Sequence, residues 1–482
     1  MFCYLNPILK SRTGIAAVLM MTSSSFAMAA GVPHVRVAKH AGTSKAKTAH
    51  HVSSPLSSRQ EESVQVSVRR GVQGVNQHKA DSSTILTRQV LTERNVRVMT
   101  DIVRVAPNLT IQPSFGSSAL NFALRGIGLM DFTQNNTPSV MPYMDGVAYP
   151  LSIMTSGMLF DIDGVSVSPG PAGFTHGQAT TGGEMEFRSG DPTQQFHAGI
   201  TEDIASYGRN RVEGYLSGPL SRSVSYRIAG QSLTGGGFQH NSQGQGYGNA
   251  NLGALRGKLR WQIDETTRLD FGGHWTTDQS ETSSGHNMYN SYGVPISSDL
   301  MQTEWGLDPR FAKILGINGK NTKPREDNMF WGANVRFTKD FSWAKLTALS
   351  AYESLEEHEL TNQTNSVASY GNMFRNNQSN VFSQEVKLES NRPQDKFQWQ
   401  VGMYYSRTSI SQNFWYDSHD RPNTTPLNKT SYTQGQQNFN QYVQLSYQIL
   451  PKLKLIGAIN HESDDRRIMN VTSTNYNLNT GA

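Results

Sequence analysis

The sequence predicts a small mixed α/β domain followed by an antiparallel transmembrane β-barrel. Three observations predict this architecture. The chain begins like a secreted bacterial protein, residues 75–190 mix short helical and strand patterns with many turn signals, and residues 195–482 alternate apolar with polar side chains. Alternation at a period of two suits a wall that has lipid on one face and water on the other.

Composition excludes a membrane protein built from helices and argues against nucleic-acid binding. The longest clearly apolar run, residues 14–21, is far shorter than the roughly 20 residues that a spanning helix needs. The net charge is +5, but the first 60 residues hold seven basic residues and no acidic one, so the remainder carries −2. The basic character therefore belongs to the N-terminal segments and not to a surface for nucleic acid.

Residues for catalysis or metal binding form no recognisable motif. Cys3 is the one cysteine and lies in the expected leader, so the mature chain would have no disulfide and no thiolate ligand. His50 and His51 lie in a polar tail and make a poor metal site. His358 begins a zincin-like pattern that lacks its second histidine. We therefore expect no enzyme activity, no cofactor and no metal site.

The N-terminus, residues 1–29, is predicted to be a secretory signal peptide. Lys10 and Arg12 precede the apolar run, and Ala27 and Ala29 then supply an A-x-A cleavage pattern. Residues 30–60 are polar and without periodicity. Because they can bury too little apolar surface to offset the entropy of ordering, they are predicted to form a disordered periplasmic tail.

A short strand-forming segment follows at residues 61–70, where Val64, Val66 and Val68 alternate with polar side chains. A partner protein can capture such a segment by strand addition. The alternative is an ordinary edge strand of the next domain.

The domain at residues 75–190 is predicted from its apolar spacing and its turns. Residues 82–104 have the spacing of short helices, and residues 122–128 form a strand that runs into a glycine turn. Asp145 and Gly146 are a hairpin signal. The segment is therefore expected to be compact, mixed and rich in turns.

Eleven strands are predicted in residues 195–482. They cover 195–206, 211–218, 222–232, 250–263, 267–278, 328–338, 343–354, 381–389, 397–407, 439–450 and 453–462. The turns after even-numbered strands are short, whereas the connections at 233–249, 279–327, 355–380 and 408–438 are long. A soluble sandwich would also alternate, but short turns at one end and long loops at the other are typical of outer-membrane barrels.

The mixed domain resembles the plug domain of TonB-dependent outer-membrane receptors. The matching segments, in order, are DIVRVAPNLTIQ at 101–112, FALRGIG at 122–128, YMDG at 143–146, LFDI at 159–162, Gly170, Pro171, Gly173, Gly177 and TGGE at 181–184. The segment FSQEVKL at 382–388 resembles a recurrent barrel strand of the same family. We call the mixed domain the plug and the strands after it the wall.

The resemblance implies that residues 61–70 contain a TonB box, which pairs with a TonB-type energy-transducing protein in the periplasm. The residues expected to bind it are Glu62, Ser63, Val64, Gln65, Val66, Ser67 and Val68.

The resemblance also implies a set of residues that hold the plug together. They are Arg125, Gly126, Asp145, Gly146, Gly170, Pro171, Gly182 and Gly183. Arg125 and Asp145 are expected to be paired inside the plug and not exposed, and the glycines to occupy turns that a Cβ would strain. Ser166 and Pro169 stand where the family usually has a glutamate and an arginine. That charged pair is thought to tie the plug to the wall, so its loss puts plug anchoring in question.

The wall is predicted to be incomplete. A receptor of this family has about 22 strands, and the sequence supplies 11. In hydrocarbon each unpaired backbone group at an open edge costs several kcal/mol. The sequence-level hypothesis is therefore a truncated or split receptor that does not transport alone.

The resemblance predicts a receptor for TonB-dependent, energy-coupled uptake of a scarce ligand, with a ferric siderophore or similar iron chelate favoured. The expected location is the bacterial outer membrane, with tail and plug entered from the periplasm. The expected partners are the TonB-type protein, the chelate and outer-membrane lipid, and no nucleic acid. The alternatives are a passive porin, an adhesin and an inactive receptor remnant, which energy-dependent uptake would separate from a receptor.

Ligand contacts are expected at the plug apex and in the long loops, because aromatic rings and amides suit the faces and rim of an organic chelate. The candidates are Phe115, Phe132, Gln134, Asn135 and Asn136 at the apex and Trp305, Trp415 and Tyr416 in the loops. Alternatively, the loop aromatics pack on each other or form the interfacial girdle.

Overall fold

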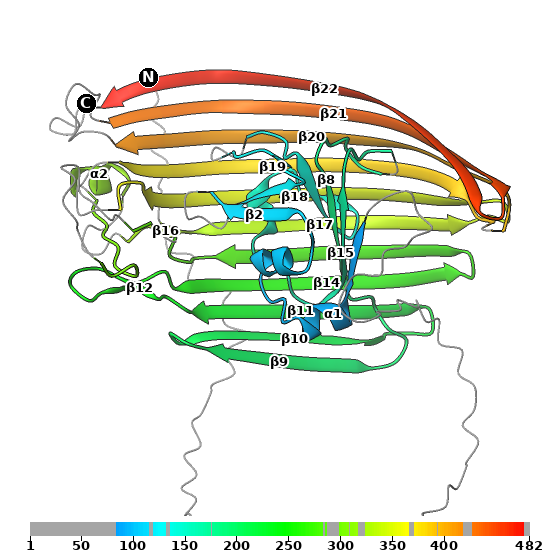
Figure 1. Cartoon of the computed structure of the whole chain (residues 1–482), viewed down its shortest axis with the longest axis horizontal. Helices are drawn as coiled ribbons and strands as arrows, with labels where there is room; N and C mark the ends of the chain where they lie inside the picture. Colours follow the sequence, from blue (N-terminus) through cyan, green and yellow to red (C-terminus); the bar gives the residue numbers. More distant parts are fainter. Residues whose placement is uncertain are drawn as a thin grey trace, which may run out of the picture. The chain divides into compact units, whose positions relative to one another are not determined.

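The wall is an antiparallel sheet in which eleven strands follow one another in sequence order (Figure 1). The strands are β9 (His197–Ala205), β10 (Arg209–Pro219), β11 (Val224–Gly235), β14 (Ala250–Asp264), β15 (Thr267–Asp278), β17 (Asn328–Asp340), β18 (Ala344–Asn362), β19 (Asn372–Ser390), β20 (Phe397–Asp417), β21 (Leu427–Leu450) and β22 (Leu453–Tyr476). β9 and β22 are its two edges, and in the described chain no pairing joins them. The predicted fold class is confirmed, with a wall that does not close.

This computed structural model describes residues 83–476, apart from 115–118, 132–134, 175, 283–284, 287–297, 308, 317–322, 366–370, 393 and 418–426. The predicted signal peptide, polar tail and TonB box lie outside the described residues. None of the helices in the described part is long and apolar enough to cross a membrane.

The last five strands are longer than the sequence pattern predicted. β18 to β22 have 19 to 24 residues, whereas the earlier wall strands have 9 to 15. The predicted loops at 355–380 and 408–438 are therefore largely strand. The pattern failed there because polar residues occupy both faces, as in the stretch Asn-Lys-Thr-Ser at 428–431. Alternation marks a strand only where one face is apolar and the other polar.

Cross-strand pairing assigns the two faces of the wall. Directly paired residues share a face, and Leu255, Trp275 and Trp331 form one such row across three strands. Each is about 40% exposed on the outer face. The residues between them point to the inner face, where Arg256 is buried. Trp343 and Trp399 stack with their centroids 6.1 Å apart near the short turns.

The plug is built from two small sheets and short helices. Its elements are β1 (Thr84–Thr87), α1 (Arg88–Glu93), η1 (Met99–Arg104), β2 (Leu109–Pro113), β3 (Leu120–Leu124), β4 (Ile127–Gly128), β5 (Val140–Met144), β6 (Val147–Ala148), η2 (Ser152–Thr155), β7 (Ile162–Pro169) and β8 (Gly183–Ser189). One sheet has the order β1-β7-β8-β5-β6 and the other the order β2-β3-β4. Plug and wall belong to one compact unit, Val68–Ala482.

Four of the predicted turn glycines have a backbone that a side chain would strain. Gly126 and Gly146 have φ of 79°, Gly170 has 107° and Gly183 has 133°. At Gly182 a side chain would clash instead, because a Cβ there would lie 2.9 Å from the carbonyl oxygen of Ser139. Glycine at these positions fits its predicted role.

Arg125 differs from its prediction. It precedes Gly126 in the tight turn between β3 and β4, has a φ of 51°, and is exposed. The expectation that it is not exposed is wrong, because two successive left-handed residues direct this turn away from the core. Pro171, which follows Gly170, is also exposed.

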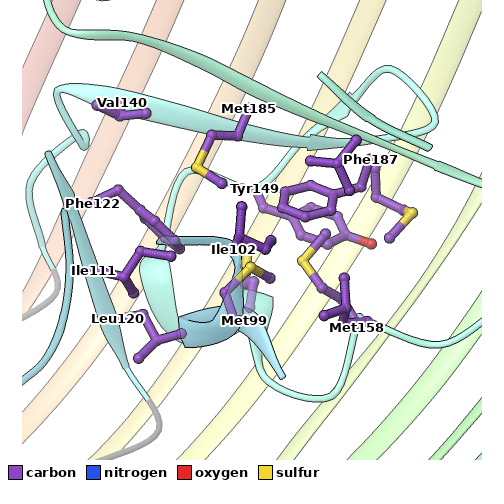
Figure 2. Packing of buried hydrophobic residues seen from close by; sticks show 14 of the residues in the cluster. Met99, Ile102, Ile111, Leu120, Phe122, Val140, Tyr149, Met158, Met185 and Phe187 are labelled. Atoms are coloured by element: carbon purple, nitrogen blue, oxygen red, sulfur yellow. The ribbon is translucent and has the colours of Figure 1, made fainter. Parts of the chain in front are cut away.

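The apolar core of the plug continues into the wall. Figure 2 shows Met99, Met158 and Met185 among the rings of Tyr149 and Phe187. The same buried cluster includes six inner residues of β17 to β20, namely Phe330, Leu349, Ala351, Leu355, Val381 and Ile410. The plug therefore completes its core only against the wall.

The described part of the long connection at 279–327 is not plain loop. β16 (Arg325–Glu326) pairs with β18, and α2 (Pro309–Ile314) buries Phe311 beside Leu427. In the preceding connection, β12 (Gln239–His240) and β13 (Gly246–Tyr247) pair with each other.

Candidate functional site

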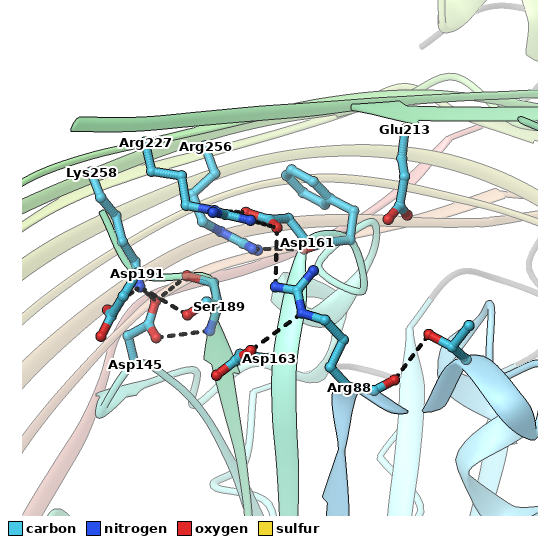
Figure 3. Close-up of polar contacts among 12 residues, drawn as sticks. Arg88, Asp145, Asp161, Asp163, Ser189, Asp191, Glu213, Arg227, Arg256 and Lys258 are labelled. Atoms are coloured by element: carbon cyan, nitrogen blue, oxygen red, sulfur yellow. Dashed lines mark hydrogen bonds and ion pairs between the residues drawn. The ribbon is translucent and has the colours of Figure 1, made fainter. Parts of the chain in front are cut away.

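The interface between the plug and the inner face of the wall is the candidate functional site. On one side it contains a buried ion pair between Asp161 and Arg227 of β11 (Figure 3). The guanidinium makes two hydrogen bonds to this carboxylate, one of them 2.6 Å from Nε to Oδ2. The two side chains are 5% and 7% exposed. Arg88 of the plug reaches the same carboxylate from its exposed side, at 3.4 Å.

Asp145 forms a second ionic contact. Its carboxylate lies 3.0 Å from Nζ of Lys258 on β14 and accepts hydrogen bonds from the backbone and the hydroxyl of Ser189. Burial would raise the pKa of Asp145, but Lys258, Arg256 and the Ser189 hydroxyl outweigh it, so the pKa lies below its ordinary value. Asp145 is therefore paired, as expected, and its partner is a wall residue.

Arginines of the wall also bind backbone carbonyls of the plug. Arg256 donates to Phe160 O and Met158 O, each at 3.0 Å, and its guanidinium lies over the Phe160 ring. Arg211 of β10 donates to Leu159 O at 2.8 Å. We call these contacts of β10, β11 and β14, with the two ion pairs, the ionic clamp.

Ser166 and Pro169 stand where a charged pair was expected to anchor the plug, and the ionic clamp provides this anchoring through other residues. Both residues lie in β7, and Ser166 pairs with Ile85 and Glu186 inside the plug sheet. The plug is nevertheless tied to the wall, because Asp161 and Asp145 carry the charged contacts. Sequence reasoning missed this role of Asp161, although it lies within the LFDI segment.

On the other side of the plug, β19 and β21 contact its backbone mainly through neutral groups. Asn440 donates to Gly173 O at 3.0 Å and to Gly177 O at 2.9 Å. The backbone N–H of Gly177 donates to Glu385 at 3.0 Å, and Tyr442 donates to the same carboxylate.

The predicted apex residues Asn135 and Asn136 are both hydrogen-bonded to the carboxylate of Asp131. One oxygen of Asp131 accepts from the backbone N–H of Asn135 at 3.0 Å and of Asn136 at 2.9 Å. The Asn135 amide then donates to the Tyr432 hydroxyl at 2.7 Å, and Gln434 donates to Asn135 O at 2.6 Å. The structure thus brings Asn135 against β21 and leaves Asn136 exposed, as are its hydrogen bonds to Asp131 and Asn135.

A polar row of the inner wall leads away from this apex contact. Register pairs Tyr432 with Gln412, Gln412 with Asn377 and Asn377 with Glu357. Next to the row, Arg375 forms ion pairs with Glu357 and Glu359, and all three residues are almost fully buried. Sequence reasoning missed these residues because they fall in the segments that it assigned to loops.

The other ligand candidates have different surroundings. Phe115, Phe132 and Gln134 lie outside the described residues. Trp305 stacks on Tyr247 at 4.9 Å, and Trp415 packs on Tyr476 at 5.3 Å, so these two aromatics pack on other rings, as the alternative held. Tyr416 is half-buried in β20, a strand and not a loop. A ligand role for these residues stays a prediction.

The side chains at the interface between plug and wall form hydrogen bonds and ion pairs. Within the described ranges no group of three or more His, Cys, Asp or Glu side chains could hold a metal ion.

The sequence of this chain is similar to those of known proteins. A protein-family profile described as "TonB-dependent Receptor Plug Domain" matches residues 57–184. The iron-regulated outer membrane virulence protein of Vibrio cholerae is 23% identical over 233 residues, which is 46% of this chain and 35% of that protein. The ferripyoverdine receptor of Pseudomonas aeruginosa is 26% identical over 146 residues, 30% of this chain and 17% of that protein.

Solved structures share the fold. The crystal structure of the ferric yersiniabactin uptake receptor from Yersinia pestis superposes with a TM-score of 0.67 at 17% identity, covering 80% of this chain and 61% of that one. The ferripyoverdine receptor of P. aeruginosa gives 0.64 at 14% identity, with 83% and 54% covered. The chain thus spans little more than half to three fifths of these structures and about a third or less of the two curated relatives.

Proposed function

Because this chain carries the plug domain of TonB-dependent receptors and a wall with the fold of their barrels, we propose that it serves energy-coupled uptake of a ferric siderophore or similar iron chelate across the bacterial outer membrane. Proteins of this family are transporters and not enzymes. The observation that carries the proposal is a plug packed by apolar, ionic and hydrogen-bonding contacts on the inner face of a sheet whose outer face exposes large apolar side chains. A passive pore would have no use for such a plug.

The energy source would be a TonB-type protein that captures residues 61–70. The family match at 57–184 includes this segment. Strand addition depends on backbone hydrogen bonds, so Val66→Pro should abolish capture by removing a donor and fixing φ. Val66→Ala, which keeps the donor, is the matched control. Equal capture of a TonB-type periplasmic domain by both variants in a pull-down would contradict capture of residues 61–70 by strand addition.

The cargo is inferred from the relatives, one named an iron-regulated outer membrane virulence protein and the other a ferripyoverdine receptor. The test is uptake of ⁵⁵Fe chelates by a receptor-deficient strain that expresses the chain joined to barrel strands that pair its edges β9 and β22, with and without its TonB-type protein. Uptake that requires the TonB-type protein supports a receptor, and uptake that persists without it identifies a porin.

We also propose that the eleven strands transport only when the edges at β9 and β22 are paired. Both edge strands run in the same direction, because an odd number of antiparallel strands separates their ends, so they cannot pair antiparallel with each other. Residues 30–482 expressed alone should then show neither heat-modifiable mobility nor uptake. A folded, transport-competent product would contradict the proposal.

A further inference from the structure

We propose that the inner face of β21 is a neutral hydrogen-bonding track, at which the plug separates from the wall and along which an uncharged chelate passes. The inference rests on the proposed uptake function and names the route and the charge class of the ligand. It comes from the side chains of one strand and from what each of them contacts.

The track consists of six successive inner positions of β21. They are Tyr432, Gln434, Gln436, Asn438, Asn440 and Tyr442. Each is an amide or a phenol, and none is charged. The residues between them point outward, and Gln437 and Gln441 are exposed. The inner face of β14 differs, because it carries the charged residues Arg256, Lys258 and Arg260.

The plug occupies the track through contacts that another ligand could reproduce. Gln434 donates to the backbone oxygen of Asn135, and Gln436 donates to the hydroxyl of Thr137 at 3.0 Å. Asn440 donates to two further backbone oxygens of the plug. Each contact joins a neutral donor to a neutral acceptor, so a chelate that presents carbonyl or hydroxamate oxygens can replace the plug at little electrostatic cost.

Asn438 holds an acceptor that the plug does not use. Its side chain is fully buried, and its Nδ2 donates to Glu462 at 2.5 Å. Its Oδ1 has no hydrogen-bond partner. A buried acceptor without a partner is costly, and here it lies between the occupied positions Gln436 and Asn440. It is available to an N–H or O–H donor of a ligand.

The ionic clamp explains why separation occurs at β21. On the β11 and β14 side, parting plug from wall would separate buried carboxylates from Arg227 and Lys258. On the β21 side it exchanges mainly neutral hydrogen bonds, together with single contacts from Gly177 N–H to Glu385 and from Arg466 to the Thr137 hydroxyl. The plug therefore stays attached at β11 and β14 while its opposite side opens.

Neighbouring charges select the ligand. Glu385, Glu462 and Asp464 flank the track, and Arg466 is paired with Asp464 at 2.9 Å. The surplus of carboxylates disfavours a polyanionic chelate. An uncharged ferric trihydroxamate has the required chemistry, because its rim offers carbonyl acceptors and amide donors.

Thiol labelling tests the route without relying on uptake. In a Cys3→Ser background, Asn438→Cys places a thiol in the track, and Ala254→Cys places one on β14, where Ala254 packs beneath Phe160 of the plug. Both positions are at most 2% exposed. In outer membranes, with the edges β9 and β22 paired by added barrel strands, we expect a neutral maleimide to label the track thiol about tenfold faster or more, because labelling follows local opening. Equal rates, or faster labelling on β14, would overturn the route. If Asn438→Cys does not fold, Gln436→Cys replaces it.

Charge substitution tests the ligand class. Gln436→Glu should reduce uptake of a neutral ferric trihydroxamate about tenfold or more by placing a second carboxylate beside Asp464, whereas Gln437→Glu, on the outer face at the same height, should leave it unchanged. Equal uptake by both variants would overturn the selection by charge. If the unsubstituted chain takes up no chelate even when its edges β9 and β22 are paired, the proposed function fails, and the labelling result still decides whether the plug separates at β21.

Discussion

The two sides of the plug are held to the wall by different chemistry. β10, β11 and β14 use arginine and lysine against plug carboxylates and carbonyls, whereas β21 uses amides and phenols. Breaking one partner of a buried ion pair costs about 3–5 kcal/mol, and a neutral hydrogen bond contributes about 0.5–1.5 kcal/mol. One plug can thus be fixed on one side and releasable on the other without any change in its own fold.

Removing the clamp should have the largest effect. Arg227→Met leaves the buried Asp161 with only its exposed contact to Arg88, and we expect local opening of the plug to become easier by about 3–5 kcal/mol. Hydrogen exchange at Gly190, whose N–H donates to Asp161 O, reports this opening. The double variant Asp161→Asn/Arg227→Met should recover part of the loss, and a double variant no better than the single one would contradict the assignment.

A glycine on the track side gives the next effect. Gly177 has a φ of 65°, and a Cβ there would overlap the Tyr143 ring. Gly177→Ala should detach this part of the plug from Glu385 and Asn440 at a cost of about 1–3 kcal/mol. Gly170→Ala is the control, since its φ is 107° but a Cβ meets nothing within 4 Å. Equal protease sensitivity of the two variants would show that the contact with Tyr143 is unimportant.

Acid should release the clamp before the track. The pKa of Asp145 is lowered in the folded protein, so its contribution is complete above its unfolded pKa of about 3.9. That contribution is lost as the pH falls through the lower folded value. Hydrogen exchange at Ser189, whose N–H donates to Asp145, should therefore rise only below about pH 4. Asp145→Asn should abolish this acid-dependent rise, and a rise near pH 6 in the unsubstituted chain would point to another group.

Single amide contacts of the track should matter least. Gln434→Ala removes one hydrogen bond to the Asn135 carbonyl, and we expect about 1 kcal/mol of local destabilisation at the apex. The Asn440→Ala variant, which loses two such bonds, should show about twice that effect in the exchange of neighbouring plug amides. A cost like that of Arg227→Met at either position would remove the distinction between the two sides.

The parts of the wall strands next to the short turns could be predicted from local sequence patterns. Alternation at a period of two, short turns and turn glycines such as Gly146 and Gly183 depend on residues that are neighbours in the chain. Where lipid lies outside and polar groups inside, the alternation of side chains within a strand shows which residues belong to each face. Strand segments such as residues 428–438 carry polar side chains on both faces, and their composition was indistinguishable from that of a loop.

The order of plug and wall, the eleven strands and the glycine turns could be predicted from the sequence, because each is encoded within a few consecutive residues. Which side chains meet depends on the folded arrangement of plug and wall. Asn135 and Gln434 are 299 positions apart, and Asp161 and Arg227 are 66 apart. Their contacts arise because the wall presents its inner face to the plug and the strand register sets the height of each side chain. The division between ionic clamp and neutral track therefore appears only when the two are packed together.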